Sequence, residues 1–258
     1  MKKALKAIVA ATVLATATVA SATPSTTYWT PATTYTQPFL VPHLTYDTYF
    51  AEGGQLQPDY GLTMGILPFD KVQGEVGIDL FTPGLHKDNF YLNGKLTLVE
   101  GAFAEWQPGV SLGIQSVGFK KDYSDYNHLY LSVGKTFGLG TVNVGGYRGG
   151  NKVLYTSSTG KVEQTGFMAS YTSPDINVKA TGLGKIVIVA DYASGNNYFG
   201  AYGLGAAFYF TPAIDVITGP VMFNDKDLMK GTYGASFMWT VQLDVDFDLR
   251  APTPAPAK

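Results

Sequence analysis

Residues 237–247 show the clearest alternation of apolar and polar side chains in the chain. The odd positions of this run are large and apolar, with aromatic rings near both ends. From Thr240 onward the even positions are polar, and Asp244 and Asp246 are among them. Successive side chains of a β-strand point to opposite faces, so the run predicts a strand with one hydrocarbon face and one carboxylate-bearing face. Such a strand suits a wall between lipid and water; an outer strand of a soluble sandwich, which alternates in the same way, is the alternative.

The same period of two recurs along the chain between turn-forming residues, and it predicts twelve strands. The run 72–81 is the clearest after the last one, whereas 185–192 is ambiguous because Ile186–Val189 is apolar on both faces. The predicted strands cover residues 43–50, 59–67, 72–81, 90–99, 109–119, 128–136, 140–148, 163–171, 185–192, 198–210, 213–222 and 237–247.

The connections between these strands alternate in length. Short connections marked by Pro or Gly follow even-numbered strands, and longer polar connections follow odd-numbered ones. Outer-membrane barrels have short periplasmic turns and longer outer loops. The alternation therefore predicts an all-β, antiparallel, up-and-down transmembrane β-barrel with both termini periplasmic. Around 100–109 and 173–184 the connections are long where short ones are expected, so ten or fourteen strands stay open alongside twelve.

The two ends of the chain differ from the barrel region. Residues 1–22 are typical of a cleavable signal peptide, because three lysines precede a short apolar run and an Ala-Ser-Ala cleavage site. Residues 23–42 are rich in Thr, Tyr and Pro, and they predict a periplasmic arm or, alternatively, a plug inside or across the barrel mouth. The barrel is expected over 43–248. Residues 249–258 form a Pro/Ala tail that we expect to be disordered.

Composition narrows the class further. Charged residues make up only 15% of the chain, below the roughly 25% of soluble domains, which fits an exterior that is partly lipid. The absence of cysteine excludes disulfides, Cys-ligated metals and covalent c-type haem. We expect no cofactor and no bound metal. The net charge of −2 and the lack of a basic patch argue against a nucleic-acid partner.

The signal peptide, the alternation, the unequal connections and the final aromatic strand ending at Phe247 together resemble the small bacterial outer-membrane β-barrels of the porin-like type. The end of that strand is similar to the signal that the barrel-assembly machinery reads. The resemblance implies a place in the outer membrane of a Gram-negative cell, contact with outer-membrane lipid, and assembly by that machinery.

The inward carboxylates are the candidates for function. They could line a pore that favours cations or neutral solutes, as acidic rings do, or they could belong to a solvated or salt-bridged interior in which Lys95 is a partner. The predicted lumen-lining residues are Glu75, Asp79, Tyr91, Asn93, Lys95, Tyr130, Asp244 and Asp246, and the predicted lipid-facing residues are Val76, Ile78, Trp239, Val241, Leu243, Val245 and Phe247.

Small residues at Gly203, Gly205 and Ala207 leave volume inside the barrel. Either a solute path or an inward ring, such as that of Tyr91 or Tyr130, would use this volume.

No catalytic set stands out. The histidines are His43, His86 and His128, and each is interpreted as an exposed loop or interface residue. Asp122 and Asp125 near His128 are loose candidates for the paired carboxylates of a barrel protease. We expect no enzyme activity and no catalytic residues. The favoured function is a passive channel for ions or small polar solutes with an acidic and tyrosyl lumen. The alternatives are a plugged structural, adhesion or partner-binding barrel that acts through its extracellular loops, and an outer-membrane hydrolase.

Overall fold

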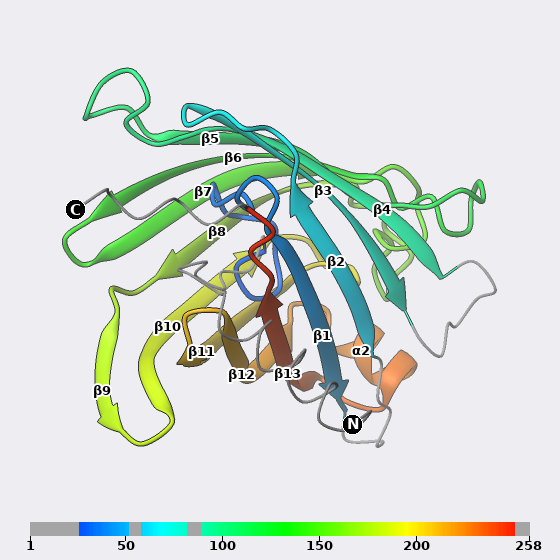
Figure 1. Ribbon diagram of the computed structural model, residues 1–258. Helices are drawn as coiled ribbons and strands as arrows, with labels where there is room; N and C mark the ends of the chain where they lie inside the picture. Colours follow the sequence, from blue (N-terminus) through cyan, green and yellow to red (C-terminus); the bar gives the residue numbers. More distant parts are fainter. Residues whose placement is uncertain (1–25, 52–57, 82–88, 251–258) are drawn as a thin grey trace, which may run out of the picture.

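The computed structural model describes residues 26–51, 58–81 and 89–250. Twelve antiparallel strands close a barrel in which β13 pairs with β1 and β10 pairs with both β8 and β11 (Figure 1). The predicted all-β, antiparallel barrel of about twelve strands is confirmed. The strands of the closed wall are β1 (Pro42–Phe50), β2 (Asp59–Gly65), β3 (Val72–Phe81), β4 (Phe90–Leu98), β5 (Gly109–Val117), β6 (His128–Phe137), β7 (Gly140–Arg148), β8 (Thr165–Thr172), β10 (Leu183–Ala193), β11 (Ala201–Thr211), β12 (Ile214–Phe223) and β13 (Phe237–Asp246).

The two unexpectedly long connections do not change the strand count. The connection 173–184 contains a short extra strand, β9 (Ile176–Ala180), which pairs with the first part of β10 while β8 pairs with its last part. The connection 99–108 is a compact turn, in which the Gln107 side chain donates to the carbonyl of Val99 and accepts from the amide of Phe103. Neither connection adds a pair of strands to the barrel.

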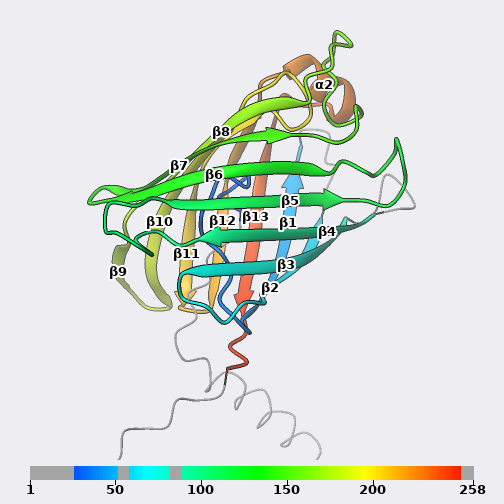
Figure 2. The ribbon, with the colours of Figure 1, turned by 90° about the horizontal axis from the view of Figure 1, so that it is seen from above.

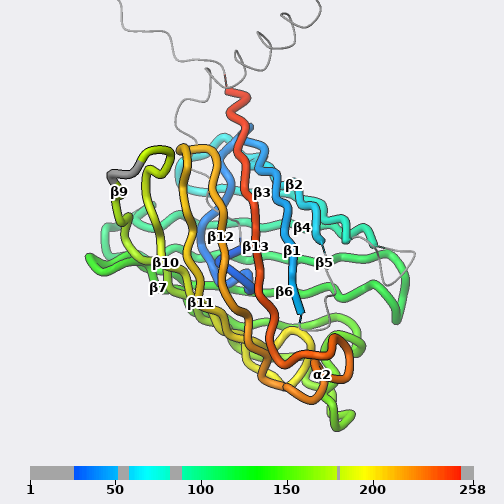
Figure 3. The backbone as a smooth tube through the Cα atoms, turned by 90° about the horizontal axis from the view of Figure 1, so that it is seen from below, coloured from blue at the N-terminus to red at the C-terminus, as the bar shows by residue number. Residues whose placement is uncertain are grey.

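The barrel has two distinct ends. We call the end that carries 118–127, 149–164, 194–200 and the helix α2 (Lys226–Tyr233) the loop end, and the end that carries 66–71, 138–139 and 212–213 the turn end. Figure 3 shows α2 and β9 at opposite ends of the molecule. No helix in the described part of the chain is long and apolar enough to cross a membrane.

The outer face of the wall is hydrocarbon. On β13, Trp239 and Leu243 are exposed whereas Thr240, Gln242 and Asp244 are at most 3% exposed, as the period of two predicts. The exposed aliphatic side chains lie along the middle of the strands and form what we call the apolar belt: Leu44, Leu62, Val76, Ile78, Leu92, Leu96, Leu112, Leu129, Leu131, Val142, Val144, Leu204 and Leu243.

Exposed aromatic rings border the belt on both sides. Those nearer the turn end are Phe69, Phe103, Trp106, Phe137, Tyr171, Phe210 and Phe247, and those nearer the loop end are Phe50, Tyr60, Phe81, Phe90, Phe119, Phe167, Tyr202, Phe237 and Trp239. Of the predicted lipid-facing residues, Val76, Ile78, Trp239, Leu243 and Phe247 are exposed, and Val241 and Val245 are half-buried on the same face.

Residues 26–41, which we call the internal segment, lie inside the barrel (Figures 1 and 3). Tyr28, Thr30, Ala32 and Gln37 are at most 2% exposed. The segment is joined by hydrogen bonds to strands β2, β3, β4, β6, β7, β8, β10 and β13. It enters at the turn end, where the amide of Leu40 donates to the carbonyl of Gly65 at 3.1 Å, and reaches the level of β10 residue Asp191.

A row of small or short polar side chains makes room for the segment. These residues lie opposite one another on successive strands and face inward, and we call them the trough: Gly109, Gly134, Asn143, Ser170, Asp191 and Gly203. Gly134 is one position where a side chain cannot fit, because an added Cβ would overlap the side chains of Thr34 and Asn143.

The inner faces of β10 and β12 carry apolar side chains that pack against the segment. Val187, Val189, Ile217 and Val221 form a buried cluster with Tyr28. This packing explains why 186–189 is apolar on both faces: one face belongs to the exterior and the other to a dry contact inside the barrel. The volume left by Gly203 and Gly205 is filled by an inward tyrosine ring, which was one of the two alternatives, but the ring is that of Tyr28 rather than of Tyr91 or Tyr130.

Gly203→Ala tests the seating of the segment. An added Cβ would overlap the Tyr28 ring, and overpacking of this kind costs about 1–3 kcal/mol. We expect residues 26–31 to leave the wall more often, so that chymotrypsin cleaves after Tyr28 or Trp29 of the folded protein about tenfold faster. Gly138→Ala is the matched control, because its Cβ would meet no atom within 4 Å. Equal cleavage rates for the two variants and the parent would contradict this placement.

Candidate functional site

A cavity of about 350 Å³ lies beside the internal segment, on the inner side of β1 to β5. It extends from Thr63 and Glu75 in the middle of the barrel to Tyr126 and Tyr198 at the loop end. Residues Tyr28 and Trp29 of the segment form part of its wall. The segment therefore occupies one side of the lumen and the cavity the other. Figure 2 shows the backbone of the segment, in blue, among the strands of the wall.

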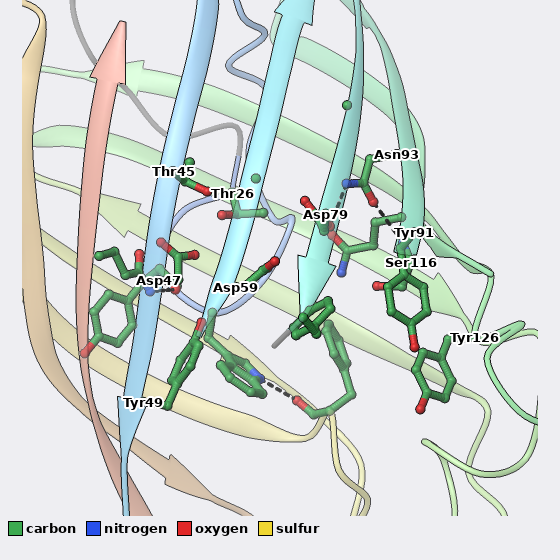
Figure 4. A pocket seen from close by; sticks show the side chains of 18 of the residues that line it. Thr26, Thr45, Asp47, Tyr49, Asp59, Asp79, Tyr91, Asn93, Ser116 and Tyr126 are labelled. Atoms are coloured by element: carbon green, nitrogen blue, oxygen red, sulfur yellow. Dashed lines mark hydrogen bonds between the residues drawn. The ribbon is translucent and has the colours of Figure 1, made fainter. Parts of the chain in front are cut away.

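Carboxylates of neighbouring strands gather on the cavity wall (Figure 4). Asp47 on β1 lies directly opposite Asp59 on β2, and Asp79 on β3 lies opposite Gly61, one step along the same face. Asp244 on β13 lies opposite Thr45. Like charges that face each other across two strands are destabilising, so this arrangement is maintained only where water, a cation or a proton on one of the carboxyls reduces the repulsion.

Most of the predicted lumen-lining residues border this cavity. Glu75, Asp79, Tyr91, Asn93, Tyr130 and Asp244 line it, whereas Lys95 and Asp246 are buried on the inward face without bordering it. Asn93 donates to Asp79 at 2.7 Å and accepts from the amide of Ser116 at 2.9 Å, which fixes the Asp79 carboxylate toward the cavity.

Glu75 and Lys95 form a buried ion pair with an Nζ–Oε1 distance of 3.0 Å. The second oxygen of Glu75 accepts from the amide of Gln37 at 2.6 Å. This pair therefore matches the salt-bridged interpretation of the interior, and it also holds the internal segment.

His43 lies between two carboxylates. Its Nδ1 is 2.8 Å from Asp246 Oδ1 and its Nε2 is 3.3 Å from Asp244 Oδ1. Gln37 donates to the same Asp246 oxygen at 2.8 Å. His43 is 1% exposed, so its interpretation as an exposed or interface residue is wrong.

His128 is also buried, and that interpretation is wrong for it too. Its Nδ1 is 2.6 Å from the hydroxyl of Tyr155, and its ring stacks with Tyr147. Asp125 instead accepts from Asn151 at 2.8 Å. The suggested grouping of Asp122, Asp125 and His128 is therefore not held together by these contacts. His86, the signal-peptide range 1–22 and residues 251–258 of the tail lie outside the described residues.

Three acidic residues that matter in the structure were not among the predicted set. Asp47 and Asp59 occupy inward positions of strands that were predicted, so the period of two already contained the signal. Asp191 was missed because its strand is apolar on both faces. It is 5% exposed, and one of its oxygens accepts from the amides of Trp29 and Thr30 at 2.7 Å each.

Among the described residues, no group of three or more His, Cys, Asp or Glu side chains is placed to hold a metal ion. Beyond the last strand, Asp248 forms an ion pair with Arg250. The guanidinium of Arg250 holds the pKa of the Asp248 carboxyl below its usual range.

Comparisons with known proteins return distant likenesses of fold. No protein-family model matches the chain, and no curated protein matches it in sequence. Among solved structures, an outer membrane channel from Pseudomonas putida F1 is 10% identical with a TM-score of 0.43, and the match covers 83% of this chain and 97% of that one. OmpF of Salmonella typhi, solved with daunomycin, is 9% identical with a TM-score of 0.38, over 80% of this chain and 96% of that one. Likenesses this distant say nothing about what the present chain transports or binds.

Lys95→Met tests the buried ion pair. Removing the lysine leaves Glu75 buried without its counter-charge, which costs about 3–5 kcal/mol. We expect the free energy of unfolding, measured in urea by tryptophan fluorescence, to fall by that amount and to recover largely when Glu75→Gln is added. Lys135→Met is the control, because Lys135 pairs with Glu100 at a partly exposed site, where a pair contributes less than about 1 kcal/mol. Equal losses in the two single variants would contradict the burial of the Glu75–Lys95 pair.

Proposed function

We propose that the protein is an integral β-barrel of a bacterial outer membrane that conducts small cations and small polar solutes. The apolar belt and its two aromatic borders support the membrane location. Monomeric soluble proteins rarely expose contiguous apolar surface beyond a few hundred Å², whereas a barrel in lipid shows an apolar band flanked by aromatic residues.

The two ends support an orientation. Barrels of this class have short turns on the periplasmic side and longer connections outside, so the turn end faces the periplasm in our proposal. Both ends of the described barrel lie there, because the amide of Phe247 donates to the carbonyl of Pro42. Assembly by the barrel-assembly machinery, through the aromatic end of β13, is part of the same proposal.

The observation that carries the channel function is the hollow, carboxylate-lined side of the lumen. A barrel of eight strands is filled by side chains, and sixteen strands leave an aqueous channel. Here the internal segment divides a lumen of intermediate size, and the space that remains is bordered by Asp47, Asp59, Asp79 and Asp244. Rings of acidic side chains favour cations over anions.

The segment restricts this path toward the turn end. Gln37, with its hydrogen bonds to Glu75 and Asp246, lies between the cavity and the periplasmic side of the barrel in our proposal. Conductance is therefore small in the intact chain and larger when the segment is removed. In our proposal, no reaction is catalysed in the lumen.

Planar-bilayer recording tests the channel. We expect the intact mature chain to give small cation-preferring currents in a KCl gradient, and a chain lacking residues 26–38 to give larger ones. Asp47→Asn/Asp59→Asn should move the reversal potential toward zero, while Asp175→Asn, an exposed residue paired with Lys185 outside the cavity, should leave it unchanged.

Two results would count against the channel. One is the absence of current with or without residues 26–38, which would favour the alternative of a plugged partner-binding barrel, an alternative supported by the many hydrogen bonds of the segment. The other is an unchanged reversal potential in the double variant, which would remove these carboxylates from the path.

A further inference from the structure

The cavity joins negative charge to aromatic surface, and together these define a ligand class. We propose that it is a binding site for a small primary amine with an apolar or aromatic body, held as the ammonium ion. This inference deepens the proposed function, because it names the class of solute that the lumen takes.

The charge of the cavity is not balanced by the side chains that line it. Asp47, Asp59, Asp79 and Asp244 border the space, while its lining within the described residues includes no lysine and no arginine. The lining also includes one imidazole ring, that of His43, and its two nitrogens contact Asp244 and Asp246. A bound cation would reduce the repulsion between the facing pair Asp47 and Asp59.

Several buried acceptors of the cavity have no hydrogen-bond partner among the described residues. They include the second oxygen of Asp244, a residue that is 2% exposed, and one oxygen each of Asp47 and Asp59. Buried polar atoms normally have partners. A primary ammonium brings three N–H donors, which matches a site of several acceptors better than a quaternary ammonium with none.

Aromatic rings border the same cavity. Trp29 packs edge-to-face against Tyr49 at 5.7 Å and against Phe223 at 5.5 Å, and Tyr91 stacks on Tyr126 at 5.6 Å (Figure 4 labels Tyr49, Tyr91 and Tyr126). Ring faces attract cations and bury apolar groups. A strongly hydrated inorganic ion gains little from such a surface, and the described residues offer it no ready set of ligands.

The volume sets the size of the ligand. About 350 Å³ is at the lower end of the range for small-molecule sites, which runs from roughly 300 to 1,000 Å³. An amine with a single ring fits this range. Because Tyr28 and Trp29 belong to the internal segment, a bound amine also contacts the segment and stabilises it in place.

Direct binding to the purified full-length barrel in detergent tests the site. Phenethylamine is the probe, and 2-phenylethanol, which has the same body without the charge, is the matched comparison. We expect saturable calorimetric binding of the amine, at least tenfold tighter than that of the alcohol. Asp47→Asn/Asp59→Asn should weaken amine binding at least tenfold and leave alcohol binding nearly unchanged, Trp29→Leu should weaken both ligands, and Asp175→Asn should weaken neither.

Equal affinity for amine and alcohol, or unchanged amine affinity in the double variant, would overturn the proposal. Circular dichroism identifies a variant that has lost its β-sheet structure. If the double variant does not fold, Asp79→Asn replaces it as the carboxylate variant. The measurement needs no current. A barrel that binds the amine but does not conduct would contradict the proposed channel and support the amine site. A barrel that conducts but does not bind the amine would support the channel and contradict the site.

Discussion

Hydrogen bonds from inward side chains to the backbone of the internal segment are the interactions on which the lumen depends. A stretch containing Pro31 and Pro38 cannot pair along a β-ladder, because proline lacks the amide donor. A buried backbone group without a partner costs free energy comparable to a lost hydrogen bond. Asp191 accepts from two successive amides of the segment, Glu75 accepts from a third, and Gln242 donates to the carbonyl of Tyr28. Polar residues of the wall thus replace the neighbouring strand that the segment lacks.

This arrangement makes the lumen asymmetric. The trough and the apolar side chains on the inner faces of β10 and β12 are covered by the segment, so that part of the interior resembles the core of a soluble protein. Toward the loop end, β1 to β3 keep the carboxylates of Asp47, Asp59 and Asp79 beside the cavity. The segment therefore both narrows the barrel and supplies two aromatic residues to the remaining space. Movement of the segment would change the width of the proposed path and the proposed amine site together.

The sequence predicts the wall much better than its contents. Period-two alternation is a local property of each strand, and it placed Leu243 and Val76 outward and Asp244 and Glu75 inward because a slip of one residue would reverse every side chain. The location of the internal segment depends on contacts between residues far apart, such as Trp29 with Asp191, and no local pattern reports them. Gly203 and Gly205 indicated free volume inside the barrel, but the sequence did not indicate that the Tyr28 ring fills this volume. The two buried histidines were misread for the same reason, since their burial comes from Asp246 in one case and from the connection that carries Tyr155 in the other.

An engineered cross-link measures the position of the segment most directly, because the natural chain contains no cysteine. Thr34 lies in the trough, and a Cβ atom placed on Gly109 would be 3.1 Å from its Cβ, so that a shift of roughly half an ångström reaches the separation of about 3.5–4.5 Å found in disulfides. A Thr34→Cys/Gly109→Cys chain should therefore form an internal disulfide nearly completely on mild oxidation of the folded barrel, while Thr34→Cys/Gly138→Cys should not. Two free thiols in the first variant, in a barrel that is otherwise folded, would place residues 26–41 outside the lumen and contradict this account of the interior.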